Sequence, residues 1–355
     1  MADHRSRLKA DVAIVGAGPA GTATAISCAR AGLRAVILER ERFPRERPGE
    51  TLHPGIEPLL RKLGVLERVS RAGFLRHEGI WVCWDSLPRF VPYGADGAEP
   101  WRGFQAWRAE LDAILLERAR ELGAEVLQPC RVLEPIVSAG RVVGVETSTG
   151  AVEARFVVDA AGSRHWLTRR LGLAIRRCLP HLVARFGYLE GVCPTRDSAP
   201  TIVAEERGWT WIAKVRPHLH HWTKLNLDGT RTEPTYVPDE LRELSPRGRS
   251  RGADVGWRVV EKPAGPGYFV VGDAAAVLDP ASSHGVLKAV LSGMLAAHLI
   301  VEAHMAGRDE RIIARGYRDW VTDRFAYDVA ELRNLYARLL KPPYWIEGVR
   351  FEPGN

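Results

Sequence analysis

The chain has 355 residues, of which 46% are hydrophobic and 26% are charged, close to ordinary globular usage. Its length suits two closely joined domains, or one domain with a large insertion. The net charge of +7 comes from arginines spread along the chain, and no nucleic-acid-binding motif accompanies them. We therefore expect a globular protein without a nucleic-acid partner.

The cysteines and the hydropathy pattern argue against three further classes of protein: metal-binding, secreted and membrane-spanning proteins. The five cysteines show no CxxC pair and no zinc-finger spacing, so we expect reduced thiols and no metal site. No apolar run approaches the ~20 residues of a membrane span. Residues 1–18 pass from a short polar leader into a strand, without a secretory signal. The sequence predicts a cytoplasmic protein with no membrane span.

The N-terminal half begins as a strand–helix–strand unit. An apolar strand is expected over 11–15, a small-residue helix over 21–31 and a strand over 35–39. Residues 42–58 are rich in proline, glycine and charge and predict a loop, before a helix over 57–69. Alternating aromatic residues over 79–90 indicate strands of a different sheet.

The rest of the sequence predicts both helices and strands. An amphipathic helix is expected over 109–123, and several strands with glycine turns over 124–158. Strands carrying Trp209, Trp211 and Trp222 follow within 175–260. A long small-residue helix over 285–303 and one or two helices over 311–340 complete the chain.

The first strand and helix enclose the sequence GAGPAG. In this context Gly16 permits a tight turn, Gly18 lets the backbone approach a pyrophosphate, and Gly21 lets helix and strand pack closely. Glu39 ends the next strand, where an acid accepts ribose hydroxyls and repels a 2′-phosphate. The loop therefore predicts FAD or NAD, but not NADP.

A second segment, YFVVGDAAAVLDPASSHG over 268–285, favours FAD. Asp273 follows an apolar strand and can accept hydrogen bonds from a polyol such as ribitol. Asp279 and Pro280 then make a turn, and the helix that starts at Gly285 directs its N-terminus toward the same place. A helix N-terminus stabilises negative charge on a reduced isoalloxazine ring.

Three motifs in this order, GxGxxG, DxxG at Asp159 and Gly162, and GD…DPxxxxG, carry a family resemblance. They resemble those of the FAD-dependent monooxygenases related to p-hydroxybenzoate hydroxylase and of the flavin-dependent halogenases, over essentially the whole chain. The resemblance implies an α/β fold, with a Rossmann-like FAD-binding domain of the GR2/PHBH type, an inserted mixed β-sheet substrate domain and C-terminal helices. We assign residues 1–72, 100–174 and 262–310 to the FAD-binding domain, 73–99 and 175–261 to the substrate domain, and 311–355 to a C-terminal helical segment.

The motifs and the resemblance together predict the residues that contact FAD: Gly16, Gly18, Pro19, Ala20, Gly21, Glu39, Arg40, Arg108, Val132, Asp159, Gly162, Gly272, Asp273, Pro280, Ser283, Gly285 and Val286. No second glycine fingerprint is visible. We therefore expect either direct reduction by NAD(P)H without a separate domain for it, or reduction by a partner flavin reductase.

The chain departs from the halogenases at two places. Those enzymes need a lysine on the strand after the flavin loop, whereas residues 75–78 read LRHE. Indole halogenases place a glutamate in the proline turn, whereas residues 281–284 read ASSH. The segments ETLHPG, GWTWIA and DPASSHGVLKA look most like those of small flavoproteins that oxygenate a tryptophan within a precursor protein during quinone-cofactor maturation.

The predicted function is FAD-dependent hydroxylation of an electron-rich aromatic ring through a flavin C4a-hydroperoxide. The substrate would be of the indole type, free or as a tryptophan in a peptide or precursor protein. Three alternatives stay open: a halogenase with non-standard catalytic residues, an FAD-dependent reductase or oxidase, and a non-catalytic FAD module that binds a client protein.

Candidate catalytic residues are His284 at the proline turn and His53 in the flavin loop, because imidazole exchanges a proton near neutral pH. Glu50 is a third candidate, with the ordering of its loop as the alternative. Trp81, Trp209 and Trp211 are candidates for stacking on the substrate, with a plain hydrophobic core as the alternative. The run of histidines at 218–221 predicts a polar turn rather than a metal site.

Overall fold

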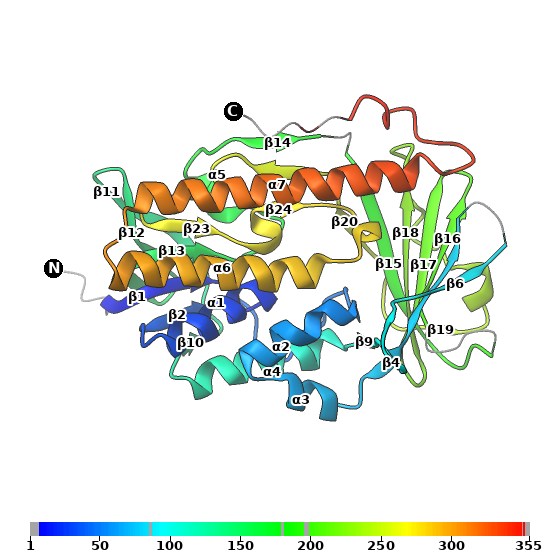
Figure 1. Ribbon diagram of the computed structural model, residues 1–355, viewed down its shortest axis with the longest axis horizontal. Coiled ribbons are helices and arrows are strands. Elements are labelled where there is room, and N and C mark those ends of the chain that lie inside the picture. The colour runs from blue at the N-terminus through cyan, green and yellow to red at the C-terminus, as the bar shows by residue number, and fades with distance from the viewer. Residues whose placement is uncertain (1–6, 85–86, 179–180, 195–198, 350, 352–355) are drawn as a thin grey trace.

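The computed structural model describes residues 7–84, 87–178, 181–194, 199–349 and 351. Two eight-stranded sheets form its framework (Figure 1). The first sheet holds β10 (Glu125–Leu127), β2 (Ala35–Leu38), β1 (Arg7–Val15), β13 (Gly150–Asp159), β12 (Arg141–Thr147) and β11 (Val132–Ser138) in this order, with β23 (Tyr268–Val270) beside β13 and β22 (Ala264–Gly265) beside β23. The predicted α/β fold is confirmed.

The first sheet is parallel where it meets the cofactor motifs. Strands β10, β2, β1, β13 and β23 run parallel, and β12 and β11 continue from β13 as antiparallel hairpins. Val12, Ala13 and Ile14 are fully buried, as expected for a parallel strand covered on both faces. The carboxyl ends of β1, β13 and β23 therefore lie together, and ligands bind at this edge of such sheets.

Helices from both ends of the chain cover this sheet. They are α1 (Pro19–Arg30), α4 (Arg108–Glu121), α5 (Trp166–Arg170), α6 (Gly285–Met305) and α7 (Glu310–Tyr336). Helices α1 and α6 pack closely because Gly293 faces Ala20, where an added Cβ would lie 2.3 Å from the Ala20 carbonyl oxygen. Figure 1 shows α7 running along α6 and continuing over the second sheet.

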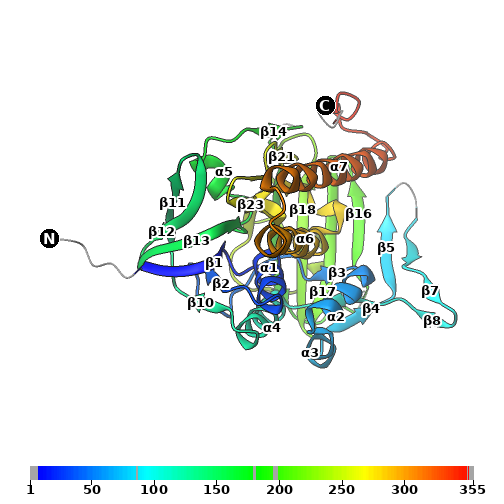
Figure 2. The same ribbon diagram turned by 60° about the vertical axis from the view of Figure 1, so that its left-hand side comes forward.

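The second sheet is mostly antiparallel. Its order is β19 (Ser245–Pro246), β15 (Val183–Glu190), β18 (Leu219–Asn226), β17 (Gly208–Arg216), β16 (Thr201–Glu205), β5 (Gly79–Cys83) and β6 (Arg89–Pro92), with β20 (Arg251–Asp254) beside β15. Figure 2 shows β5 and the hairpin of β7 (Ala95–Asp96) and β8 (Glu99–Pro100) at the far side from the N-terminus.

Small elements join the two parts. A three-stranded sheet contains β3 (Thr51–Leu52), β9 (Gly103–Gln105) and β4 (Leu75–His77), and another contains β14 (Ile175–Arg177), β21 (Arg258–Val260) and β24 (Ala276–Val277). The 3-10 turns are η1 (Pro54–Ile56), η2 (Asp239–Leu241), η3 (Gly272–Ala274) and η4 (Pro280–Ser282).

Two local expectations differ from the structure. The helix expected over 57–69 is two short helices, α2 (Glu57–Leu63) and α3 (Leu66–Arg71), because Gly64 adopts φ 69° and ends the first of them. The expectation of one or two helices over 311–340 agrees with the single helix α7. His220 and His221 are buried in β18 rather than exposed in a turn, since the turn lies between Arg216 and Leu219.

The sequence predicts no apolar run long enough to cross a membrane, but helix α6 is such a run. Its 21 residues have a mean hydropathy of 1.6 over the most apolar window, which is long and apolar enough to cross a membrane. This is weak evidence for a span, because the core helix of a globular protein meets the same criterion. The close packing of α6 against α1 is that of a core helix.

Candidate cofactor and substrate site

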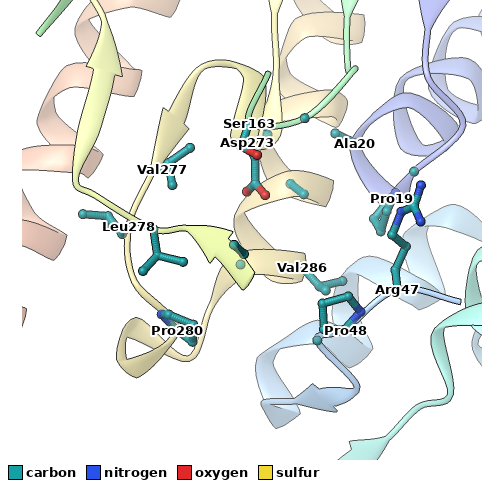
Figure 3. A pocket seen from close by; sticks show the side chains of 18 of the residues that line it. Pro19, Ala20, Arg47, Pro48, Ser163, Asp273, Val277, Leu278, Pro280 and Val286 are labelled. Atoms are coloured by element: carbon teal, nitrogen blue, oxygen red, sulfur yellow. The ribbon is translucent and has the colours of Figure 1, made fainter. Parts of the chain in front are cut away.

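A cavity of about 1950 Å³ lies between the two large sheets and is lined by residues from all three predicted FAD-domain segments. Pockets for one small ligand usually measure about 300–1,000 Å³. The cavity therefore has room for a dinucleotide and a second molecule. Figure 3 shows part of its wall, where Asp273, Ser163, Pro19 and Val286 surround the opening.

The glycine loop between β1 and α1 forms one end of the cavity. Gly16 adopts φ 103°, and an added Cβ there would lie 2.6 Å from the Ala160 carbonyl oxygen. A Cβ on Gly21 would lie 2.0 Å from the Gly16 carbonyl oxygen, so Gly21 is required for packing and does not line the cavity. A Cβ on Gly18 would meet only Arg45, at 3.7 Å, and would occupy cavity space instead. This open space lets a pyrophosphate approach the main chain of the glycine loop.

Two helix N-termini open onto the same cavity. Helices α1 and α6 have 12 and 21 residues, and neither has a side-chain cap at its N-terminus. Their first residues, Pro19 and Gly285, both line the cavity. Uncapped N–H groups and the positive helix dipole favour anionic groups. One such terminus suits a pyrophosphate, and the other suits the reduced isoalloxazine ring.

Glu39 lies at the end of β2, as predicted, and lines the cavity. One of its carboxylate oxygens accepts a hydrogen bond from the Ala17 N–H at 2.8 Å, and the other from the Glu41 N–H at 2.9 Å. Arg45 lies 3.9 Å from Glu39 and 3.2 Å from Asp112. The carboxylate is thus fixed beside the glycine loop, where it can accept ribose hydroxyls.

Arg108 and Asp112 hold the flavin loop to α4. Arg108 makes two parallel hydrogen bonds to Asp112, at 2.9 and 3.0 Å, and donates a third to the Pro48 carbonyl oxygen at 2.9 Å. The nearby Asp112 carboxylate raises the pKa of the Arg108 guanidinium. Arg108 was predicted from the sequence, whereas Asp112 and Arg45 were not; the spacing of four residues in a helix was the available signal for Asp112.

Asp273 lies in η3, directly after β23, and its side chain is exposed to the cavity. The protein around the cavity raises the pKa of this carboxyl by desolvation, whereas Arg108 and Arg258 act in the opposite direction. No hydrogen bond within the described part of the chain engages its carboxylate. A polyol hydroxyl in the cavity would supply such a partner, and this fits the ribitol role predicted for Asp273.

Asp159 and Trp81 occupy other places than the predicted contacts. Asp159 is fully buried behind the cavity wall, where it accepts hydrogen bonds from the Ala161 and Leu167 N–H groups at 2.9 and 2.8 Å. It therefore shapes the loop that lines the cavity, and Gly162 of the same loop does line it. Trp81 lies on β5 against Phe90 and outside the cavity wall.

The other predicted residues converge on the cavity. Those that line it are Gly16, Gly18, Pro19, Ala20, Glu39, Arg40, Arg108, Val132, Gly162, Gly272, Asp273, Pro280, Ser283, Gly285 and Val286, with the candidates Glu50, His53, His284, Trp209 and Trp211. They come from positions up to 270 residues apart in the sequence.

A buried network fixes the turn before α6. Asp279 is fully buried and accepts hydrogen bonds from Trp257 Nε1 at 2.7 Å, from the Tyr336 hydroxyl at 2.8 Å and from the Ala281 N–H at 2.9 Å. The Tyr336 hydroxyl in turn accepts a hydrogen bond from Trp209 Nε1 at 2.9 Å. The turn is thereby tied to the end of α7 and to β17 of the second sheet.

The inner face of the second sheet forms the opposite end of the cavity. Every second residue of a strand faces the cavity, as the pleat requires. The lining side chains on this face are Ile80, Ala184, Phe186, Ile202, Trp209, Trp211, His221 and Thr223. One face of α7 adds Arg324, Tyr327, Asp328, Glu331, Leu332 and Leu335. This end is rich in aromatic side chains and suits a planar substrate ring.

Two histidines lie where the flavin loop meets the turn before α6. The rings of His53 and His284 are 5.4 Å apart, and His53 lies 4.8 Å from the ring of Tyr93. Burial lowers the pKa of both imidazoles, and Lys288 adds to the effect at His284. Both are therefore neutral near pH 7 and able to accept a proton. The sequence placed His284 at the proline turn and His53 in the flavin loop, and the structure brings these two segments together.

Comparison with known proteins decides the family. Residues 9–218, more than half of the chain, match the protein family described as FAD binding domain. The chain belongs to the FAD-binding monooxygenase and halogenase superfamily. This flavoprotein is thus an FAD-dependent enzyme of the oxidoreductase class.

Named relatives of the flavoprotein include enzymes of two kinds. A 1H-pyrrole-2-carbonyl-[peptidyl-carrier protein] brominase of Pseudoalteromonas luteoviolacea (strain 2ta16) is 30% identical over 341 residues, covering 87% of this chain and 81% of the brominase. A menaquinone reductase of Mycobacterium tuberculosis (strain ATCC 25618 / H37Rv) is 29% identical over 380 residues, covering 94% and 85%. The structure of the flavin-dependent brominase Bmp2 aligns with a TM-score of 0.80 at 25% identity, covering 96% of this chain and 89% of that chain.

The relatives bear on the predicted reaction as well as on the fold. Their names support the halogenase alternative better than the hydroxylase prediction. None of the three is a tryptophan oxygenase of quinone-cofactor maturation, so the comparisons give that subfamily no support. The family assignment also argues against a non-catalytic FAD module.

The segment where halogenases need a lysine lies outside the cavity wall of the flavoprotein. Arg76 of β4 donates to Glu57 at 2.6 Å and to two backbone carbonyl oxygens. His77 is buried, its Nδ1 lies 3.1 Å from the Gly79 carbonyl oxygen, and its Nε2 faces Gly103. None of the four residues 75–78 lines the cavity. The residues at this segment therefore do not face the cavity in this chain.

Proposed function

We propose that the flavoprotein is a monooxygenase that hydroxylates an electron-rich aromatic ring, such as the indole of a tryptophan in a peptide or precursor protein. The observation that carries this proposal is the composition of the cavity wall. Among the described residues that line it there are arginines, histidines and acids, but no lysine. An enzyme that passes hypohalous acid to a lysine would need such an amine near its substrate.

The proposed reaction consumes one molecule of O2, two electrons and two protons. FAD, once bound and reduced by NAD(P)H or by a partner flavin reductase, supplies the two electrons for the activation of O2. One oxygen atom enters the ring, and the other leaves as water with two protons. The protein must therefore hold the ring, exclude water and move protons.

The chain offers residues for each of these tasks. Phe186 and Trp211 provide aromatic surface for the ring at the substrate end of the cavity, whereas Trp209 is fully buried and lies behind this surface. Helix α7 covers the flavin-side turn, where the Asp279 network excludes water. The neutral imidazoles of His53 and His284 exchange protons beside the N-terminus of α6.

Halogenation is the second candidate, favoured by the names of the relatives. If it applies, the aromatic substrate is tethered to a carrier protein, as the name of the brominase states for that enzyme. Lys288 lies in the first turn of α6, but its ammonium binds the Asp328 carboxylate at 2.8 Å. This lysine is therefore occupied. A reductase is a third candidate, favoured by the menaquinone reductase relative.

The test is an isotope experiment. The FAD-loaded protein is reduced, mixed with a tryptophan-containing peptide and exposed to ¹⁸O2, and the peptide is analysed by mass spectrometry. The proposal predicts one labelled oxygen atom in the indole ring. A reduced substrate without label would support the reductase, and oxidation of the flavin without a modified aromatic product would contradict the proposal.

A further inference from the structure

A buried acid–imidazole pair lies in the cavity wall where the two large sheets approach each other. Glu50 belongs to the flavin loop directly before β3, and His221 lies in the middle of β18. Both side chains line the cavity, although they are only 1% and 6% exposed. A buried carboxylate is costly unless it is hydrogen-bonded, so its partners indicate what it does.

Glu50 accepts two hydrogen bonds and has His221 as a third, more distant neighbour. One carboxylate oxygen accepts a hydrogen bond from the Tyr188 hydroxyl at 2.5 Å, and the other accepts one from the Gly49 N–H at 2.9 Å. The second oxygen also lies 3.9 Å from Nδ1 of His221. This distance is too long for a hydrogen bond, but the negative charge of the carboxylate favours a proton on the facing Nδ1 of His221. The lone pair of Nε2 is then the acceptor.

The acceptor atom has only a weak partner. Nε2 of His221 lies 3.4 Å from the Thr223 hydroxyl, beyond the usual length of a hydrogen bond between nitrogen and oxygen. Thr223 lines the cavity beside His221. A substrate hydroxyl or ring N–H in the cavity can therefore replace Thr223 as the donor to this nitrogen.

The pair is close to the flavin side of the cavity. A Cβ added to Gly49 would lie 3.3 Å from Arg108 and 4.0 Å from Val286 in the first turn of α6. Figure 3 shows Pro48 beside Val286, so the loop that carries Glu50 passes next to the N-terminus of α6. The pair thus faces the space between the proposed flavin position and the aromatic end of the cavity.

We propose that His221, oriented by Glu50, accepts the proton of a ring hydroxyl or ring N–H of the substrate. The substrate class is then an aromatic ring that bears such a hydrogen, and this inference rests on the proposed function. The proton passes from the substrate to Nε2, while the proton on Nδ1 stays directed at Glu50. For a ring hydroxyl, loss of the proton raises the electron density of the ring, which makes it a better nucleophile toward an electrophilic oxygen atom. For a ring N–H, the proton is transferred as the ring is attacked and positive charge develops on the nitrogen. The proton returns to solvent after the product leaves.

The charges around His221 agree with this role. Burial lowers the pKa of its imidazole, and the Glu50 carboxylate opposes this effect. Tyr188, which packs against both side chains from β15, stays protonated because burial and Glu50 raise the pKa of its hydroxyl. The imidazole is therefore neutral near pH 7, and Glu50 stabilises the cation that forms when it accepts a proton.

The test uses 4-nitrophenol as a probe, because its phenolate form absorbs visible light. The FAD-loaded protein is titrated with the probe at a series of pH values, and the absorption difference gives the pKa of the bound phenol. In the wild type we expect the bound phenol to ionise at least about one pH unit below the free phenol, a tenfold effect. His221→Asn should abolish this shift, and Glu50→Gln should reduce it.

His220→Asn is the matched control, because His220 is buried on the opposite face of the same strand and lies outside the cavity wall. This variant should keep the wild-type shift. A shift that survives His221→Asn, or a wild type that does not bind and ionise the probe, overturns the inference. The flavin content of each variant verifies that it is folded.

The isotope experiment separates this inference from the proposed function. Labelled product from a wild type without the phenol shift leaves the monooxygenase proposal standing and overturns the role of His221. A phenol shift without labelled product contradicts the monooxygenase proposal but supports a proton acceptor at His221. With both results positive, His221→Asn should lower the rate of product formation at least about tenfold, with little change in the rate of flavin reduction.

Discussion

The Tyr336→Phe substitution tests the network that fixes the flavin-side turn. The hydroxyl of Tyr336 donates to Asp279 and accepts from Trp209, and all three side chains are fully buried. The other donors to Asp279 are the N–H groups of Trp257 and Ala281, so this set of partners fits the ionised carboxylate. Removal of one hydroxyl therefore affects two further buried groups.

The expected cost follows from these contacts. A hydrogen bond to a charged group contributes about 1.5–3 kcal/mol, and the stranded indole N–H of Trp209 costs about 1–3 kcal/mol. We expect Tyr336→Phe to lower the free energy of unfolding by about 3–5 kcal/mol. The matched control is Tyr317→Phe, on the same helix and equally buried, whose hydroxyl makes one neutral hydrogen bond to the Val270 carbonyl oxygen. Its cost should be about 1 kcal/mol.

Urea unfolding of both variants, saturated with FAD and followed by circular dichroism, measures this difference. FAD affinity, measured by flavin fluorescence, should fall in Tyr336→Phe and stay unchanged in Tyr317→Phe. Equal costs in the two variants would refute the reasoning that the Asp279 network holds the turn.

Three further predictions follow from the site. Gly18→Ala should leave the thermal stability of the FAD-free protein unchanged and weaken FAD binding about tenfold or more. Gly21→Ala should destabilise the fold itself, because its Cβ would lie 2.0 Å from a carbonyl oxygen. Calorimetry with FAD titration separates the two effects, and identical behaviour of the two variants would contradict their assigned roles. Asp273→Ala should lose most of its FAD, and a wild-type ratio of flavin to protein absorbance would contradict a ribitol contact. Burial lowers the pKa of His165 from 6.5 to about 4, so its contribution to stability is full above about pH 6.5 and is lost as the pH falls toward 4. The difference in unfolding free energy between wild type and His165→Gln should therefore shrink by about 3 kcal/mol over this pH range. A difference that stays constant with pH would contradict this prediction.

The cofactor end of the site could be predicted because its requirements are local. GAGPAG demands particular backbone conformations within six residues, and the structure shows the contacts that demand them at Gly16 and Gly21. Asp273 and Gly285 follow a strand and begin a helix, so their place at the edge of the sheet also follows from the local pattern. Glu39 is a similar case, since it ends a strand that is parallel to β1.

The substrate end depends on contacts between distant segments, and here the sequence was less informative. His221 looked like part of a polar turn because four neighbouring residues included three histidines, but the strand begins at Leu219 and buries it. Its partner Glu50 lies 171 residues earlier in the chain. Tyr336 and the face of α7 meet the cavity only because α7 extends over both sheets (Figure 1). No local pattern encodes these contacts.

The most direct test of the central claim is the product formed in the presence of halide. The FAD-loaded protein is reduced and reacts with ¹⁸O2 and a tryptophan-containing peptide in excess bromide and chloride, and the product is identified by mass spectrometry. Because no lysine among the described residues lines the cavity, the account predicts a labelled hydroxylated indole and no halogenated one. A brominated or chlorinated product would contradict it.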